Sequence, residues 1–294
     1  MKNKRKLTPW LYSMPALILI GMVIVFPIIY TGYISLTNMN LFHWSNYEFI
    51  GLSNYSRALL KADSGFLGAL FTTLLWTTLN MVIQVVVAYF IALGFQREDL
   101  KGKRVYKTLL MFPWAMPAYV SILLWRVGIY NTEFGLLNKI LVALGFGKVN
   151  FLSTNVPAFL SCMTLNLWMA LPFMIMMIDG ALSSIDRSYY ELDGAGFWSK
   201  NIHITVPAMK GIIAPAVIMT TFTTFKQFDI VYLLTMQKGA YSGATLQTII
   251  TYAQQNAFVS NNYGLSSAVS IIIFFLIMVF SLFTNRGVKE ENYD

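Results

Sequence analysis

Charged residues are scarce in this sequence. Asp, Glu, Lys and Arg make up 12% of its 294 residues, about half of their share in an ordinary soluble domain. Hydrophobic residues make up 56% and aromatic residues 15%. This is the composition of a membrane protein, and it excludes a soluble globular domain.

Cysteine and histidine are almost absent as well. The single Cys162 lies in an apolar run, and the two histidines, His43 and His203, are predicted on opposite sides of the membrane. A disulfide framework and a cysteine-rich metal site are therefore excluded. The sequence also lacks a P-loop, a His-Glu-x-x-His motif and a Gly-x-Ser-x-Gly elbow. We expect no catalytic residue and no metal site, which leaves transport as the function.

Six apolar runs are long enough to cross a hydrocarbon core of about 30 Å. The sequence therefore predicts an all-α integral membrane protein with six transmembrane helices over residues 10–284, between a segment at 1–9 and a tail at 285–294. The six runs lie near residues 10–36, 66–95, 105–130, 155–182, 208–236 and 263–284.

Basic residues outnumber acidic ones by 21 to 13, but they are scattered over short connectors. Nucleic-acid binding needs cations gathered on one face, so no nucleic-acid partner is expected. One side of the membrane carries 14 cations, at the amino terminus, between spans two and three, between spans four and five, and after span six. The other side carries six. Because cations gather on the cytoplasmic side, both termini are predicted cytoplasmic.

The polar connector between spans four and five carries a recognisable pattern. Gly194 is followed by nine residues and then by Ile204, Thr205, Val206 and Pro207. This resembles the cytoplasmic signature of permease subunits of binding-protein-dependent ABC importers, of the MalF-like carbohydrate family. Four further segments resemble that family in the same order along the chain: "FIGLSNYSRAL" (49–59), "FPWAMPAYVSILLWR" (112–126), "LNLWMALPFMIMM" (165–177) and "FKQFDIVYLLT" (225–235).

The resemblance implies that residues 185–207 form a coupling loop of two short helices at a right-angled bend, which fits a cleft in an ATPase subunit. Glycine permits a sharp turn, exposed large apolar side chains need a partner to cover them, and proline ends a helix. An ordinary hairpin packed on its own bundle is the alternative. The expected coupling residues are Glu191, Asp193, Gly194, Ala195, Gly196, Phe197, Trp198, Ile204 and Pro207.

This loop departs from the family pattern in one place. Two alanines and one further residue are missing between Glu191 and "LDGAG". Losing three helical residues shortens a helix by about 4.5 Å and rotates the next part of the chain by about 60°. Either a partner compensates for the missing turn, or this form of the loop couples poorly.

Ionisable groups within spans are costly, so they are interpreted as functional or paired. Lys226 and Asp229 are three apart on span five and are expected to share a helix face with Thr223. They form an internal ion pair or line the pathway. By resemblance, the pathway residues are Trp168, Met169, Ala170 and Phe173 on span four, and Thr223, Phe225, Lys226 and Asp229 on span five. If Lys226 and Asp229 line the pathway, Gln227 is expected to lie there with them.

Two further elements are expected outside these sites. Pro113 and Pro117 lie four apart in span three and should kink it. The segment "NTEFGLLNKILVALGFG" has the spacing of a short amphipathic helix at the membrane surface.

The resemblance also implies partners. They are a second homologous permease, two copies of a cytoplasmic ABC ATPase that bind ATP and Mg, and an extracellular sugar-binding protein that docks near residues 37–65, 131–154 and 237–262. The substrate would be a carbohydrate, such as a maltodextrin, and the location a bacterial-type cell membrane with its lipid. No cofactor is expected in this chain. The alternatives are an ion-coupled secondary transporter using Lys226 and Asp229, and a membrane scaffold.

Overall fold

The computed structural model describes residues 4–61, 65–185, 196–236 and 246–291, and these ranges are built almost entirely of helices. They contain no β-strand beyond an isolated bridge between Thr37 and Phe49. Five helical segments and one sharply bent pair are long and apolar enough to cross a membrane, which confirms the predicted six-span, all-α fold. They are Trp10–Ile34, Phe66–Gln96, the pair Lys103–Ala115 and Ala118–Ile129, Asn155–Ser183, Phe197–Thr235, and Tyr263–Leu282.

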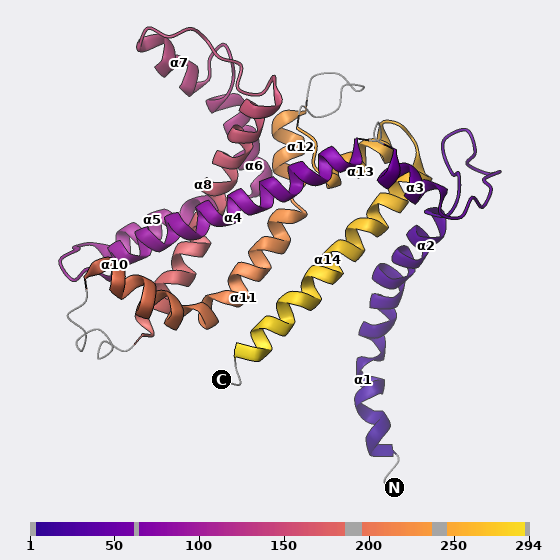
Figure 1. Cartoon of the computed structure of the whole chain (residues 1–294), viewed down its shortest axis with the longest axis horizontal. Helices are drawn as coiled ribbons and strands as arrows, with labels where there is room; N and C mark the ends of the chain where they lie inside the picture. Colours follow the sequence, from indigo (N-terminus) through magenta and orange to yellow (C-terminus); the bar gives the residue numbers. More distant parts are fainter. Residues whose placement is uncertain (1–3, 62–64, 186–195, 237–245, 292–294) are drawn as a thin grey trace. The chain divides into compact units, whose positions relative to one another are not determined.

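Several of these spans are built from more than one helical element (Figure 1). Span one joins α1 (Lys4–Ile20), a π-helical turn η1 (Gly21–Val25) and α2 (Phe26–Ile34). Spans two, four and six are the single helices α4 (Phe66–Gln96), α8 (Asn155–Ser183) and α14 (Tyr263–Glu291). Three short helices lie in connectors: α3 (Ser53–Leu60), α7 (Leu136–Ala143) and α13 (Ile249–Phe258). The helix α7 confirms the helix expected within residues 131–147.

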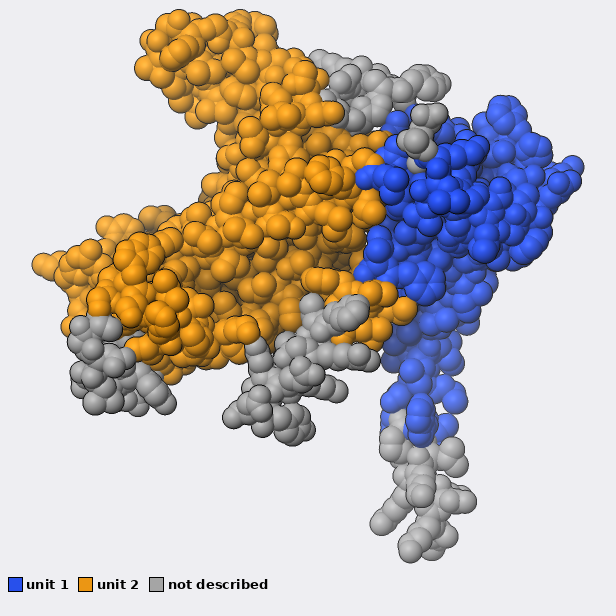
Figure 2. Space-filling view, viewed as in Figure 1, with its two compact units in different colours: residues 1–67, 252–276 blue, residues 68–251, 277–294 orange. Residues whose placement is uncertain are grey.

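The chain divides into two compact units (Figure 2). The first comprises residues 1–67 and 252–276. In it, Asn54 Nδ2 donates hydrogen bonds to the carbonyl oxygens of Ser35 and Thr37 at 2.9 and 2.8 Å. Gly264 lies against the same Thr37 carbonyl, where a Cβ would come within 2.2 Å of the oxygen. Only glycine permits this approach, so the start of α14 is fixed against the end of span one.

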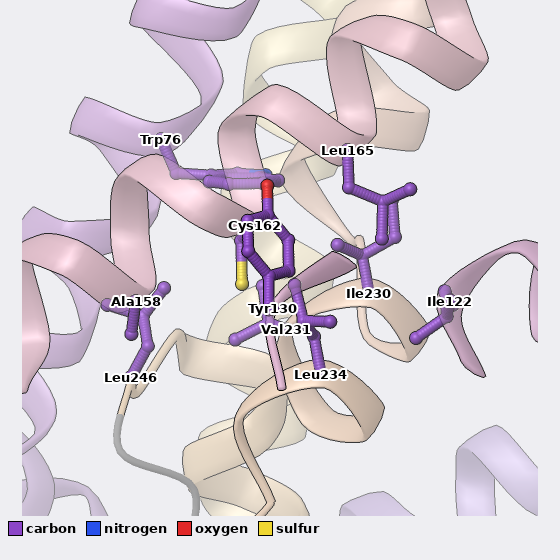
Figure 3. Packing of buried hydrophobic residues seen from close by; sticks show 10 residues of the cluster. All are labelled: Trp76, Ile122, Tyr130, Ala158, Cys162, Leu165, Ile230, Val231, Leu234 and Leu246. Carbon is purple, nitrogen blue, oxygen red and sulfur yellow. The ribbon is translucent and has the colours of Figure 1, made fainter. Parts of the chain in front are cut away.

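The second unit comprises residues 68–251 and 277–294 and contains spans two to five. One of its apolar clusters gathers around Trp76, Tyr130 and Cys162 (Figure 3). Trp76 is fully buried on α4, and its Nε1 donates a hydrogen bond of 3.2 Å to the Thr224 carbonyl at the end of α11 (Val206–Phe225). This hydrogen bond joins span two to span five.

Span three is broken between Ala115 and Ala118, near its two prolines. Its halves are α5 (Lys103–Ala115) and α6 (Ala118–Leu124), the second continued by a π-helical turn η3 (Trp125–Ile129), and they meet at 91°. Met116 is extended, with ψ of 141°, and Pro117 caps α6. A residue before proline is forced out of the helical region, so Pro117 sets the break. Pro113 lies within α5 and does not interrupt it.

Span five also differs from a single helix. It begins with α10 (Phe197–Lys200) and a π-helical turn η4 (Asn201–Thr205), continues as α11, and resumes after a break as α12 (Asp229–Thr235). Arg126 fixes α12, because its two terminal nitrogens donate to the carbonyl oxygens of Leu233 and Met236 at the helix end. A cation at a helix C-terminus also suits the helix dipole.

Candidate functional site

A cavity of about 370 Å³ lies among spans two to five of the second unit. Helices α4, α5, α8 and α11 and the start of α12 contribute to its wall. Its lining residues are Gln84, Trp114, Asn166, Met169, Ala170, Phe173, Met219, Thr220, Thr223, Gln227 and Ile230. None of these side chains is charged, so the cavity suits a neutral ligand.

The polar side chains of the cavity wall act mainly as hydrogen-bond acceptors. The hydroxyls of Thr220 and Thr223 donate their protons to backbone carbonyls within α11, at 2.8 and 2.9 Å. Gln84 Nε2 donates to the Ala170 carbonyl at 2.9 Å, and among the described residues Gln84 Oε1 is buried with no partner. Free acceptor oxygens are suited to a ligand that carries hydroxyl donors.

An aromatic wall complements these acceptors. The rings of Trp114 and Phe173 are stacked, with centroids 6.1 Å apart and planes at 16°. Trp114 comes from the end of α5, just before the break in span three, and Phe173 comes from α8. Such flat apolar faces match the C–H faces of sugar rings.

The structure brings together five of the nine residues expected along the pathway. Met169, Ala170, Phe173, Thr223 and Gln227 all line the cavity. Met169 and Phe173 are four residues apart on α8 and therefore share a helix face. One short sequence motif can thus supply two side chains to the same cavity wall.

The other four expected residues, Trp168, Phe225, Lys226 and Asp229, do not line the cavity. Trp168 lies on another face of α8, where its ring packs against Trp125 at 5.4 Å and borders a separate apolar groove. Lys226 is exposed at the end of α11.

The expectation that Lys226 and Asp229 share a helix face was wrong. The helix ends at Phe225, and the next begins at Asp229. Ion pairs between described residues do not include these two; instead Gln227 Nε2 donates to Asp229 Oδ1 at 2.6 Å. The helix ends explain the change, because a cation is stabilised at the C-terminus of α11 and an anion at the N-terminus of α12.

The second unit has a buried ion pair at another place, which was not predicted from the sequence. Lys107 Nζ donates to Asp179 Oδ2 at 2.5 Å, with 7% of the Asp179 side chain exposed. Gln96 Nε2 donates to Asp179 Oδ1 at 3.0 Å, so α4, α5 and α8 meet at one carboxylate. The signal was available, since Asp179 is the acidic residue within span four and such residues are costly unless paired.

Six cavity residues were also missed: Gln84, Trp114, Asn166, Met219, Thr220 and Ile230. Asn166 Nδ2 donates to Asn80 Oδ1 at 2.8 Å, which joins span four to span two. Amides inside an apolar span are a signal for Gln84 and Asn166. Nothing in the sequence separates Trp114 from the other aromatic residues.

The described part of the coupling loop begins at Gly196. The expected residues Glu191, Asp193, Gly194 and Ala195 lie outside the described residues. Phe197 and Trp198 are 56% and 64% exposed. This is the exposure expected of two large apolar side chains that contact a partner protein. The Trp198 ring lies edge-on to that of Phe90, with ring centroids 6.3 Å apart.

Two expectations for this loop need correction. Gly196 has φ of −62° and ψ of 161°, which any residue can adopt, so no glycine is required there. Pro207 does not end a helix, because α10, η4 and α11 run on without interruption. Pro207 occupies the first turn of α11, directly after the π-helical turn, where a missing N–H is tolerated. Ile204 lies within η4 itself.

Comparisons with known proteins agree with this architecture. Residues 84–288 match the family described as "Binding-protein-dependent transport system inner membrane component". The chain is 31% identical to the trehalose/maltose transport system permease protein MalF of Thermococcus litoralis, over 96% of this chain and 94% of that protein. It is 27% identical to the maltodextrin permease MdxF of Bacillus subtilis, over 93% of this chain and 67% of that protein.

Solved structures show the same fold. The crystal structure of a bacterial ABC transporter that imports the acidic polysaccharide alginate superposes with a TM-score of 0.80 at 21% identity, and covers 99% of both chains. With a family match over most of its length, the chain belongs to the inner membrane components of binding-protein-dependent transport systems, as a permease subunit of a sugar ABC importer.

Proposed function

We propose that this chain forms, with a second homologous permease, the pathway for a neutral oligosaccharide such as a maltodextrin. The observation that carries the proposal is the cavity, whose wall combines uncharged polar side chains such as Gln84 and Thr223 with the stacked rings of Trp114 and Phe173. Hydroxyl groups of a sugar match these acceptors, and its apolar faces match the rings.

We further propose that two ATPase subunits, which bind ATP and Mg, drive the transport, and that an extracellular binding protein delivers the sugar. The exposed pair Phe197 and Trp198 supports an ATPase contact, because it lies at the end of span five that adjoins the expected coupling loop. Both termini would then be cytoplasmic, as the cation distribution predicts.

The test is to co-express this chain with its candidate permease and ATPase, purify through a tag on this chain, and measure ATP hydrolysis. Hydrolysis that rises when sugar-loaded binding protein is added supports the proposal. If the ATPase co-purifies but sugar-loaded binding protein does not stimulate its hydrolysis, the shortened loop is the cause. Inserting Ala-Ala and one spacer residue after Glu191 should then restore the stimulation. Failure of the ATPase to bind even then would refute the proposal.

A matched pair of variants tests the ATPase contact alone. Replacing Phe197 and Trp198 by serine should abolish ATPase co-purification. Replacing Phe42, which is 90% exposed in the connector between spans one and two, should leave it unchanged. Equal loss in both would show that the aromatic pair is not the contact.

A further inference from the structure

A second hollow in the same unit is apolar and separate from the cavity. It has a volume of about 660 Å³ and shares no lining residue with the cavity. Its walls come from the last turns of α4, from α5 and from the middle of α8, whose ribbons are labelled in Figure 1. They include Ile91 and Phe95 on α4, Tyr106 and Leu110 on α5, and Leu171 and Ile175 on α8. We call this the α4–α5–α8 groove.

The groove and the cavity use different faces of the same helix. On α8, Met169 and Phe173 line the cavity, whereas Leu171 and Ile175 line the groove. The groove therefore lies on a different face of α8 from the cavity. Its apolar lining has the chemistry that acyl chains require.

Cations gather at one end of the groove. Leu100 lines it and is followed directly by the exposed Lys101. Lys103 precedes Tyr106 by three residues on α5, and therefore lies on the helix face that borders the groove. Arg104 is exposed beside it.

Two acidic side chains nearby, Asp99 and Asp179, already form ion pairs. Asp99 forms an ion pair with Arg97 at 2.7 Å. This hydrogen bond lowers the pKa of the Asp99 carboxyl, so Asp99 stays ionised and paired with Arg97. Asp179 pairs with Lys107. Within the described residues, no ion pair involves Lys101, Lys103 or Arg104. In this part of the structure, the end of the groove thus carries three cations outside the ion pairs, although the charge of Lys103 also acts on the Asp99 carboxylate.

The start of α5 adds backbone donors to these cations. Gly102 precedes the helix with φ of +76°, a conformation that favours glycine, and supplies no side-chain cap. Amides in the first turn of a helix point outward and favour an anion. The groove therefore combines an apolar interior with an anion-binding end.

We propose that the α4–α5–α8 groove binds an anionic phospholipid, with an acyl chain in its interior and the phosphate among Lys101, Lys103 and Arg104. Juxtamembrane Lys and Arg attract anionic headgroups, and the interior has the chemistry of an acyl chain. This proposal does not depend on which sugar the cavity takes.

The test uses the full transporter complex in nanodiscs of equal phosphatidylglycerol and phosphatidylcholine, followed by detergent extraction and mass spectrometry of the retained lipid. Wild type should retain phosphatidylglycerol selectively. The triple variant Lys101→Gln, Lys103→Gln, Arg104→Gln should retain at least about tenfold less. A charge-matched control, Arg57→Gln, Lys61→Gln, Lys139→Gln, should behave as wild type.

A second pair of variants tests the interior. Leu110→Trp fills the groove and should reduce retention, whereas Leu75→Trp, on a 40% exposed position of α4 outside the groove, should not. Equal retention of both lipids, or no effect of the three neutralisations, would overturn the proposal. Leu109 also lines the groove. Disulfide cross-linking of the variant Leu109→Cys to a cysteine in the second permease, in place of lipid retention, would overturn the proposal as well, because a protein would then cover the groove.

Discussion

At the scale of single residues, the polar side chains in the spans of the second unit divide into two kinds. Asn80, Asn166 and Asp179 satisfy one another or neighbouring groups and join helices together. Gln84 and Ser121 each keep one buried atom without a partner among the described residues. A buried unpaired polar atom is costly, so it persists where a ligand or a constraint requires it.

Gln84→Leu should weaken sugar transport. The substitution removes a polar amide from a residue that lines the cavity, and losing one hydrogen bond to the sugar should raise the KM for transport about tenfold. Uptake of labelled sugar into proteoliposomes measures it. Ser121→Ala is the matched control, because it removes the other unpaired buried atom away from the cavity. An equal rise in KM in both variants would show a general packing effect.

Asp179→Ala should destabilise the folded chain. It leaves Lys107 without its counter-charge and removes one of the acceptors of Gln96 Nε2, which also donates to Ser183 Oγ. The site is 7% exposed on the carboxylate and 30% exposed on the lysine. We expect a loss of up to about 3 kcal/mol, since Lys107 reaches some solvent. Thermal unfolding in detergent measures the loss.

The double variant Lys107→Met, Asp179→Leu provides the control for that experiment. Replacing both charges by apolar groups of similar size removes the unpaired cation and should recover much of the stability. If the double variant does not recover stability, then packing at this site, and not charge, explains the stability loss of Asp179→Ala.

At the scale of elements, the breaks in spans three and five shape the cavity wall. Trp114 stands at the end of α5 before one break, and Gln227 lies in the other, between α11 and α12. Non-helical backbone in a membrane is tolerated where it lines a cavity or is buried in protein. The two breaks therefore mark the site more clearly than any charge does.

Pro117→Ala should open the bend in span three. Without proline, Met116 regains access to the helical region, so the 91° angle between α5 and α6 should widen. Spin labels at the exposed Tyr106 and Leu124 should move apart in electron-spin distance measurements. Pro172→Ala is the control, because α8 runs unbroken through that proline. An unchanged distance would assign the bend to packing.

At the scale of the whole molecule, the energy source separates a permease subunit from an ion-coupled transporter. Lys226 and Asp229 lie outside any common helix and form no ion pair with each other, so a relay between them has no support in the structure. The double variant Lys226→Gln, Asp229→Asn should transport sugar at close to the wild-type rate.

Proteoliposomes containing the full complex provide the measurement. Uptake should require ATP and persist when a protonophore collapses the proton gradient. Loss of uptake with the protonophore, or in the double variant but not in the control Lys139→Gln, would favour ion coupling instead.

The sequence alone determined the class of this protein. Its low charge, six long apolar runs and Gly194-to-Pro207 pattern led to an all-α, six-span permease, because the hydrocarbon thickness fixes how many apolar residues a span needs. The family resemblance also picked out Met169, Phe173 and Thr223, which the structure brings to one cavity.

The tertiary structure decided what spacing could not. Lys226 and Asp229 have the spacing of one helix face, yet the chain breaks between them and helix ends stabilise each charge. Lys107 and Asp179 are 72 residues apart and form the buried ion pair instead. Sequence spacing describes one helix at a time, and pairings between helices depend on how their faces pack.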